Sequence, residues 1–388
     1  MEGPPWTNVQ SSIRQAGPHL TLVKGVIGGF LSVFILVGLP LFSGAATGGQ
    51  WTEIGSTQGT THCGEAVVGA STGNSLPTTQ ANPLFTSRPP ARGGAAQAFD
   101  AADGYVLMFG GMNNSTIFND TWSFKNGTWT RLHPASSPTP RSWASMAYDP
   151  KDGVVLLFGG WSKFPSGTMR QSDTWTFSHG NWTNLSARNP SAVGPPEGLG
   201  GAMAYDGKDG YILYFGGNGN SLYFDTWKFS GGNWTLVSAN SGPLGSYWAG
   251  MAYDAKDGYT VLFGGHGYSG TNATWKYIGG IWTQLHPSNS PTHQRNDPGL
   301  AYDRRTGYIL MFGGTPGGCP YNQTWKFSGG NWTKLNPAPH PSGRWMESMV
   351  FDQNDHYMFV FGGETSCTGH PVQYTSDSWK WTGSWTRV

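Results

Sequence analysis

The sequence predicts an all-β protein in which one four-stranded unit is repeated six times. The tripeptide Phe-Gly-Gly recurs at intervals of 48 to 57 residues, and two Trp residues follow each copy. Regular self-similarity of this kind indicates a repeat architecture. The composition of 59 Gly and 19 Trp in 388 residues agrees, because Gly disfavours helices and aromatic residues favour pleated sheet. The six tripeptides begin at Phe109, Phe158, Phe215, Phe263, Phe312 and Phe361.

Each repeat contains four predicted strands, which we label a to d in chain order. In the third repeat, strand a covers residues 201–205, and an Asp-Gly turn at 206–210 leads to strand b at 211–215. A variable loop follows, and then strands c (225–229) and d (234–237) are joined by a Gly-containing turn. Gly and Asn suit such turns because the backbone angle φ is positive there.

This pattern resembles the kelch repeat, and the resemblance covers residues 92–388. It implies a six-bladed β-propeller made of four-stranded antiparallel blades. The pattern is most similar to secreted kelch propellers such as the central domain of galactose oxidase. A single blade cannot bury both its faces, so stacking six around an axis should bury the repeated Trp and Phe residues between blades. Each blade is complete in chain order, so no strand need come from the N-terminus to close the ring.

An uncharged apolar segment near the N-terminus predicts one helix over residues 25–43, either transmembrane or part of a signal. Arg14 and Lys24 precede it, so the positive-inside rule places residues 1–24 in the cytoplasm and everything after residue 43 outside. Three interpretations stay open. The segment is a retained signal-anchor, a secretory signal cleaved near residues 43–46, or a segment resembling archaeal pilin-like signal peptides because Lys24 and Gly25 precede it. All three place the propeller at the cell surface or outside the cell.

Residues 44–91 are rich in Gly, Ser and Thr and predict a stalk or linker. Within this stretch, residues 51–54 (Trp-Thr-Glu-Ile) look like a separate copy of strand d. This copy could cover the edge of the sixth blade, or it could be a remnant of a lost blade.

Strand alternation assigns the connections to two faces of the propeller. The d-to-a connections and the b-to-c loops share one face, which we call the loop face; the a-to-b and c-to-d turns share the other, the turn face. The loop face carries the length variation, chiefly at residues 161–172 and 364–376. Since function on repeat folds usually lies where loops vary, we expect a binding site there.

Four repeats carry an arginine eight residues before the Asp that ends strand a, and the other two carry Gly198 and Ser246. Because strand a lines the central channel, these arginines are expected near its mouth. One interpretation is a cationic ring for a carboxylate, sulfate or phosphate. The other is structural, with each arginine bonded to carbonyls of a neighbouring blade or to a carboxylate. The four are Arg92, Arg141, Arg295 and Arg344.

Aromatic residues are also expected on the loop face. Trp143 and Trp248 lie two residues after the arginine position, and Trp161 and Tyr268 lie in b-to-c loops. Rings beside polar donors stack on sugars and equally well form protein-binding patches. The sequence therefore predicts a glycan or protein ligand.

Two of the three cysteines, Cys319 and Cys367, fall in b-to-c loops of adjacent blades. Outside the cytoplasm a disulfide between them is expected, the alternative being a bond from Cys63 to one of them.

The net charge of +1 gives no indication of nucleic acid as a partner. No cofactor or metal site is expected: galactose oxidase needs copper held by Tyr and His, and here only His356, in a turn-face connection, adjoins a Tyr. We assign no catalytic residues and predict a binding module. The alternative is a kelch-fold enzyme resembling sialic-acid mutarotases, in which arginines hold a carboxylate and Glu197 or Glu347 acts as acid or base.

Overall fold

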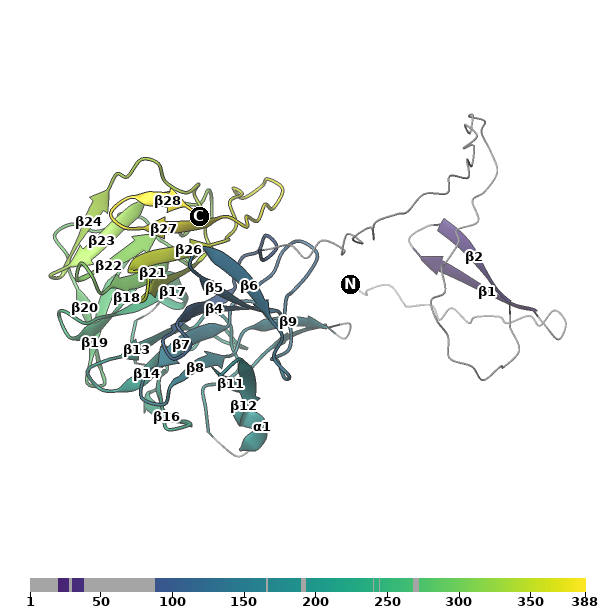
Figure 1. Ribbon diagram of the computed structural model, residues 1–388, viewed down its shortest axis with the longest axis horizontal. Coiled ribbons are helices and arrows are strands. Elements are labelled where there is room, and N and C mark those ends of the chain that lie inside the picture. Colours follow the sequence, from purple (N-terminus) through teal and green to yellow (C-terminus); the bar gives the residue numbers. More distant parts are fainter. Residues whose placement is uncertain are drawn as a thin grey trace, which may run out of the picture. The chain divides into compact units, whose positions relative to one another are not determined.

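In the computed structural model, residues 88–388 are described except 165–166, 190–192, 240, 244 and 268–271, together with two strands nearer the N-terminus. The chain divides into two compact units, Met1–Thr78 and Thr79–Val388. Figure 1 draws both, and each is described here by itself.

In the first unit, β1 (Leu20–Ile27) pairs antiparallel with β2 (Phe30–Val37). The helix predicted across residues 25–43 is therefore not supported, because the described part of that segment is strand. The physical reason lies in its Val, Ile and Phe residues, which favour pleated sheet. Among the described residues, no helix has the length and apolar character needed to cross a bilayer. Residues 51–54 and Cys63 lie outside the described part of the chain.

The second unit is a six-bladed propeller, as predicted. Each blade is a four-stranded antiparallel sheet whose strands follow one another in chain order, from innermost a to outermost d. The second blade adds a hairpin of β9 (Trp161–Phe164) and β10 (Gly167–Arg170) in its b-to-c loop, and α1 (Leu185–Arg188) after strand d.

The strands of the blades have the following bounds. Strand a is β3 (Ala96–Asp100), β7 (Ser145–Asp149), β13 (Ala202–Asp206), β17 (Gly245–Asp254), β21 (Gly299–Asp303) and β25 (Ser348–Asp352). Strand b is β4 (Tyr105–Phe109), β8 (Val154–Phe158), β14 (Tyr211–Phe215), β18 (Tyr259–Gly267), β22 (Tyr308–Phe312) and β26 (Tyr357–Phe361). Strand c is β5 (Thr121–Lys125), β11 (Thr174–Ser178), β15 (Thr226–Ser230), β19 (Thr274–Ile278), β23 (Thr324–Ser328) and β27 (Ser378–Trp381). Strand d is β6 (Thr128–Leu132), β12 (Asn181–Asn184), β16 (Asn233–Ser238), β20 (Ile281–Leu285), β24 (Asn331–Leu335) and β28 (Trp385–Arg387).

The Asp that ends strand a shapes the turn to strand b. In the third blade, Oδ1 of Asp206 accepts hydrogen bonds from the backbone N–H groups of Lys208 (3.1 Å) and Asp209 (3.2 Å). Gly210 then adopts a positive φ of 72°, which a side chain would strain, and its N–H donates to the carbonyl of Asp206. This geometry explains why an Asp-x-x-Asp-Gly sequence recurs at the turn.

The second Trp of each repeat joins its blade to the preceding one. Trp332 of β24 packs edge-on against Phe263 of the fourth blade with ring centroids 4.9 Å apart, and its Nε1–H donates to Oγ1 of Thr274 at 2.9 Å. Buried Trp is stabilising when its N–H finds an acceptor in this way. The same donor reaches the first residue of strand c of the preceding blade at every interface: Trp129 to Ser378, Trp182 to Thr121, Trp234 to Thr174, Trp282 to Thr226, Trp332 to Thr274 and Trp385 to Thr324.

The first and last blades close the ring by this interface. Trp129 packs against Phe361 with centroids 4.9 Å apart and donates to Oγ of Ser378 at 3.1 Å. Phe124 stacks on Phe359 at 4.1 Å, so the contact is also apolar. No strand is exchanged among the six blade sheets, and β28 stays with β27 in the last blade (Figure 1).

Candidate functional site

The central channel is lined by the six a strands. At the level of the strand centres the side chains are mainly Met, and nearer the turn face they are mainly Tyr. They enclose a cavity of about 890 Å³ that reaches the turn face. Six aromatic residues, one from each a strand, surround this cavity: Phe99, Tyr148, Tyr205, Tyr253, Tyr302 and Phe351.

At the loop-face end, the channel is bounded by a belt of six residues, one from each blade, that all have positive φ. We call this the channel belt. Neighbouring members are joined by backbone hydrogen bonds: Trp143 N–H donates to the carbonyl of Gly94 (2.8 Å), and Trp248 N–H to that of Gly200 (2.7 Å). Three further bonds of the same kind link Gly94 to Met346, Gly200 to Trp143, and Asp297 to Trp248. The belt residues and their φ angles are Gly94 (63°), Trp143 (54°), Gly200 (66°), Trp248 (58°), Asp297 (51°) and Met346 (59°).

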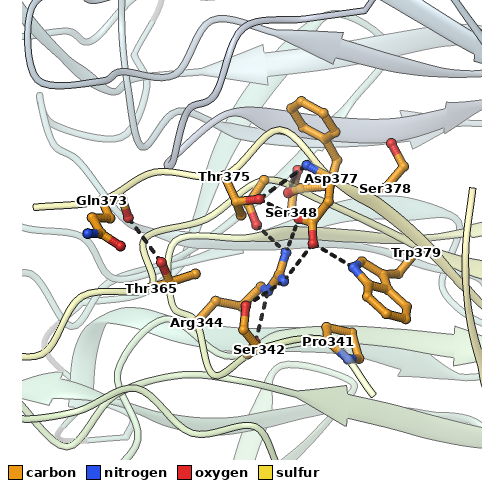
Figure 2. A network of polar contacts seen from close by, with 12 residues as sticks. Pro341, Ser342, Arg344, Ser348, Thr365, Gln373, Thr375, Asp377, Ser378 and Trp379 are labelled. Atoms are coloured by element: carbon orange, nitrogen blue, oxygen red, sulfur yellow. Dashed lines mark hydrogen bonds and ion pairs between the residues drawn. The ribbon is translucent and has the colours of Figure 1, made fainter. Parts of the chain in front are cut away.

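The four predicted arginines lie beside this belt but point into their blades. The side chains of Arg92, Arg141 and Arg344 are fully buried in ion pairs with the residue that precedes strand c. Arg344 uses every donor it has. Its Nη atoms bond Asp377 (2.6 and 3.1 Å), the carbonyl of Gly362 (2.9 Å) and Oγ of Ser342, and its Nε–H bonds the Ser342 carbonyl. Figure 2 shows the guanidinium between Ser342 and Asp377.

The other blades carry this arginine cluster in full, with an uncharged partner, or not at all. Arg92 pairs with Asp120 and Arg141 with Asp173, whereas Arg295 has Gln323 as its partner at 2.8 Å. Glycine stands at the arginine position in the third blade. Ser246 stands there in the fourth, where Ala273 replaces the acidic partner. The arginine therefore ties the Gly-Gly segment and the start of strand c together, and these contacts agree with the structural interpretation.

Pairing with the arginines lowers the pKa values of the partner carboxyls. Burial alone would raise the pKa of Asp377, but the hydrogen bonds and charge of Arg344 outweigh it and lower that pKa to about 2. The pKa values of Asp120 and Asp173 are lowered for the same reason by Arg92 and Arg141. Sequence reasoning missed these partners, although an acidic residue before strand c in four repeats was a visible signal.

The predicted aromatic residues do come together. Trp143 lies 5.6 Å from Trp248 and 6.1 Å from Trp161, measured between ring centroids. Trp248 in turn contacts Trp345 of the sixth blade at 5.8 Å and Tyr247 at 4.6 Å. Tyr268 lies outside the described residues. We call this group of partly exposed rings the aromatic cluster; it consists of Trp143, Trp161, Tyr247, Trp248, His266 and Trp345.

Two carboxyl groups lie beside the cluster in a pocket of about 90 Å³ that Trp143 and Trp248 also line. Asp297 belongs to the channel belt, and its Oδ2 accepts a hydrogen bond from Nε1–H of Trp143 at 3.3 Å. Glu347 is only 7% exposed, and its Oε1 accepts the Gly299 N–H at 3.2 Å. Glu347 was anticipated from the sequence. Asp297 was missed, although it occupies the same repeat position as Trp143 and Trp248.

Burial shifts both carboxyls strongly. It raises the pKa of Glu347 to about 8, and the charge of Asp297 adds to the rise. Burial likewise raises the pKa of Asp297 to about 7, against the opposing hydrogen bond from Trp143. Glu197, the other predicted carboxylate, is instead bonded to the side chain of Asn220 at 3.1 Å and is absent from this pocket's lining. The titratable groups that line this pocket at the channel mouth are therefore carboxyls, where an anion-binding ring of arginines was one expectation.

The predicted disulfide between Cys319 and Cys367 is confirmed. It joins the b-to-c loops of the fifth and sixth blades, and the Thr368 hydroxyl also donates to the carbonyl of Gly317 at 2.7 Å. These two loops are thus held together at the loop face. Within the described part of the chain, no three His, Cys, Asp or Glu side chains are grouped in a way that could hold a metal ion.

Comparisons with known proteins agree with this architecture. Residues 74–265 match the family model of the KLHDC2/KLHL20/DRC7 Kelch-repeats domain. Among solved structures, the chain is similar to the one described as "Structure of YjhT", with a TM-score of 0.57 and 16% identity over 78% of this chain and 99% of that one. No curated protein gives a significant match. The predicted kelch-type propeller is thereby confirmed, since a kelch-repeat model matches residues 74–265 and the fold is a propeller of six four-stranded blades.

Proposed function

We propose that the propeller is an extracytoplasmic binding module that recognises a glycan or a protein through its loop face. The observation that carries the proposal is the aromatic cluster at the channel mouth. Six partly exposed rings from the second, fourth and sixth blades lie in mutual contact there. Aromatic rings give large contact area at small entropic cost, and they dominate the binding energy of protein interfaces.

The disulfide supports both parts of the proposal. Cys319 and Cys367 hold two loops of the binding face together, which lowers the entropy lost when a ligand orders them. Structural disulfides persist in oxidising compartments, which favours a location outside the cytoplasm, either at a membrane or released from it.

The mutarotase-like alternative is less well supported. It requires arginines that reach a ligand carboxylate, but in Arg141 and Arg344 every N–H donor is already bonded within the blade. An anionic substrate would have to displace the partly buried Asp173 or Asp377 from its arginine.

Glycan and peptide arrays probed with the full-length chain test the proposal. We expect selective binding that falls at least about tenfold in Trp248→Gly. Glycine occupies the same channel-belt position in two other blades with φ of 63° and 66°, so this substitution removes the ring and keeps the backbone. Ile281→Ala, which removes an exposed side chain from a d strand, serves as control. Binding that survives in Trp248→Gly, or no selective binding on either array, would overturn the proposal.

A further inference from the structure

The pocket beside the aromatic cluster combines aromatic walls with buried carboxyl groups. Trp143 and Trp248 form two of its walls, and the carboxyl groups of Asp297 and Glu347 form part of its lining. Its volume of about 90 Å³ is small compared with the roughly 300–1,000 Å³ of pockets that enclose whole drug-sized ligands. It therefore suits one functional group of a larger ligand held by the loop face.

Two buried polar atoms of this pocket lack hydrogen-bond partners among the described residues. Glu347 is more than nine-tenths buried, and its Oε2 has no hydrogen-bond partner among the described residues. The Nε1–H of Trp248 is likewise without one. A buried carboxylate oxygen without a donor is unfavourable, and a bound positive charge would relieve that cost.

The charge balance around the pocket is negative. Two guanidinium groups act electrostatically on Glu347. The charge of Arg344 is balanced by Asp377, whereas Arg295 donates to the uncharged side chain of Gln323 and to the carbonyl of Gly313. When both pocket carboxyls are ionised, they outnumber the single uncompensated charge of Arg295. A ligand with one positive charge would complete the balance.

We propose that this pocket binds an organic ammonium group, held against the walls formed by Trp143 and Trp248, with its charge neutralised by Asp297 and Glu347. The inference rests on the proposed function and names the chemistry that its loop face recognises. Trp gives the strongest cation–π interaction of the aromatic side chains, and the carboxylates supply the opposite charge. Alkyl groups on the nitrogen would contact the rings and the side chain of Met346, which also lines the pocket.

The pH dependence of binding follows from the same groups. The raised pKa values of about 7 for Asp297 and about 8 for Glu347 mean that both carboxyls hold protons over part of the neutral range. A cation binds best when they are ionised, so binding releases protons. The affinity should rise as the pH increases from 6 to 9.

Titration of the full-length chain with choline chloride, followed by NMR or calorimetry, tests this inference. Its neutral isostere 3,3-dimethylbutan-1-ol is the matched probe, and ethanolamine tests whether methyl groups contribute. We expect choline to bind at least about tenfold more tightly than the alcohol, with an affinity that increases with pH. Equal affinity for the two probes, or no choline binding at any pH, would overturn the inference.

Three variants make the test residue-specific. Glu347→Gln keeps the side-chain shape and should lower choline affinity about tenfold and flatten its pH dependence. Trp248→Gly should lower it similarly, and Glu197→Gln, a loop-face carboxylate outside the pocket, should leave it unchanged. Thermal unfolding of each variant checks that the propeller is intact. If Glu347→Gln folds and binds choline as well as the unaltered chain does, the site is wrong.

The two proposals fail in different ways. An array ligand lost in Trp248→Gly, together with no choline binding, would leave the loop face as a binding surface and remove the ammonium group from it. Choline binding without any array ligand would support the pocket and remove the glycan or protein as its source.

Discussion

At the scale of single residues, three of the arginine clusters bury a charge that an acidic partner compensates. The Arg344 guanidinium is fully buried, and Asp377 both pairs with it and accepts the Nε1–H of Trp379 at 2.7 Å. Removing one partner of a buried pair leaves the other charge without compensation, which costs more than losing both. The fourth blade has no charge at either position, with Ser246 in place of the arginine and Ala273 in place of the acidic partner.

This contrast gives a prediction for stability. Asp377→Ala should lower the free energy of unfolding by about 3–5 kcal/mol, because Arg344 stays buried and unpaired. The double variant Arg344→Ser with Asp377→Ala copies the fourth blade and should lose less. Urea unfolding of Asp377→Ala, Arg344→Ser and the double variant measures the difference. A double variant as unstable as the sum of its single changes would contradict the role of the pair.

The contribution of the Arg344–Asp377 pair to stability depends on pH in the acid range. Because the pKa of Asp377 is lowered to about 2 in the folded state from 3.8, its contribution is complete above about pH 4 and is lost as the pH falls through 2. Asp120 and Asp173 act in the same direction. Part of the acid sensitivity of the unaltered chain should therefore disappear in the Asp377→Ala variant.

At the scale of elements, the sequence was most informative where chemistry repeats. All four strands of every blade could be predicted from the Phe-Gly-Gly tripeptide, the two Trp residues and the Asp turn. Each of these motifs recurs because its position in the blade requires the same backbone geometry every time. The segment at residues 25–43 misled because apolar length alone does not distinguish helix from strand, and its β-branched and aromatic residues form β1 and β2. The hairpin of β9 and β10 left no such repeated signal.

The disulfide belongs to this scale, since it joins two elements. Cys319→Ser should release the b-to-c loops of the fifth and sixth blades and lower the free energy of unfolding by about 2–4 kcal/mol. Amide exchange should become faster in residues 315–320 and 364–370, while the hairpin of β9 and β10, in the second blade, serves as the internal control. Unchanged exchange in both loops, despite loss of the linked peptide in non-reducing mass spectrometry, would show that the bond is not what holds them.

At the scale of the whole molecule, the ring closes by the same contacts that join its other blades. Ser378 takes the place that Thr occupies at the other five interfaces, and its hydroxyl accepts the Trp129 N–H. Closure should therefore be as strong as an ordinary blade interface. The closing interface is an ordinary one because every blade is made of four consecutive strands, as the sequence predicted.

Matched substitutions test closure. Ser378→Ala removes the acceptor at the closing interface, and Thr274→Val removes it at the interface between the fourth and fifth blades. Each leaves a buried Trp N–H without an acceptor, so each should lower the free energy of unfolding by about 1–3 kcal/mol. Denaturant unfolding compares them. A negligible effect of Ser378→Ala beside a normal effect of Thr274→Val would mean that closure depends on other contacts.

The site was less predictable than the fold, for a physical reason. Whether a charged side chain faces a ligand or its own blade depends on partners that are distant in sequence, and Arg141 finds Asp173 only after the blade has folded. The aromatic residues were easier, because Trp143 and Trp248 share a repeat position that must face the channel. Asp297 shares it too, but its acidic side chain did not stand out among aromatic neighbours.

The channel belt separates the shape of the binding site from its chemistry. Five of its hydrogen bonds are between backbone groups, and these bonds join neighbouring members whichever side chains the positions carry. Glycine, tryptophan, aspartate and methionine already occupy its positions at nearly equal φ. A new ligand preference could therefore arise by exchanging side chains around an unchanged rim, one blade at a time. The four non-glycine positions of the belt can vary around one fixed aperture, whereas a side chain at Gly94 or Gly200 would collide with Ser142 or Trp248.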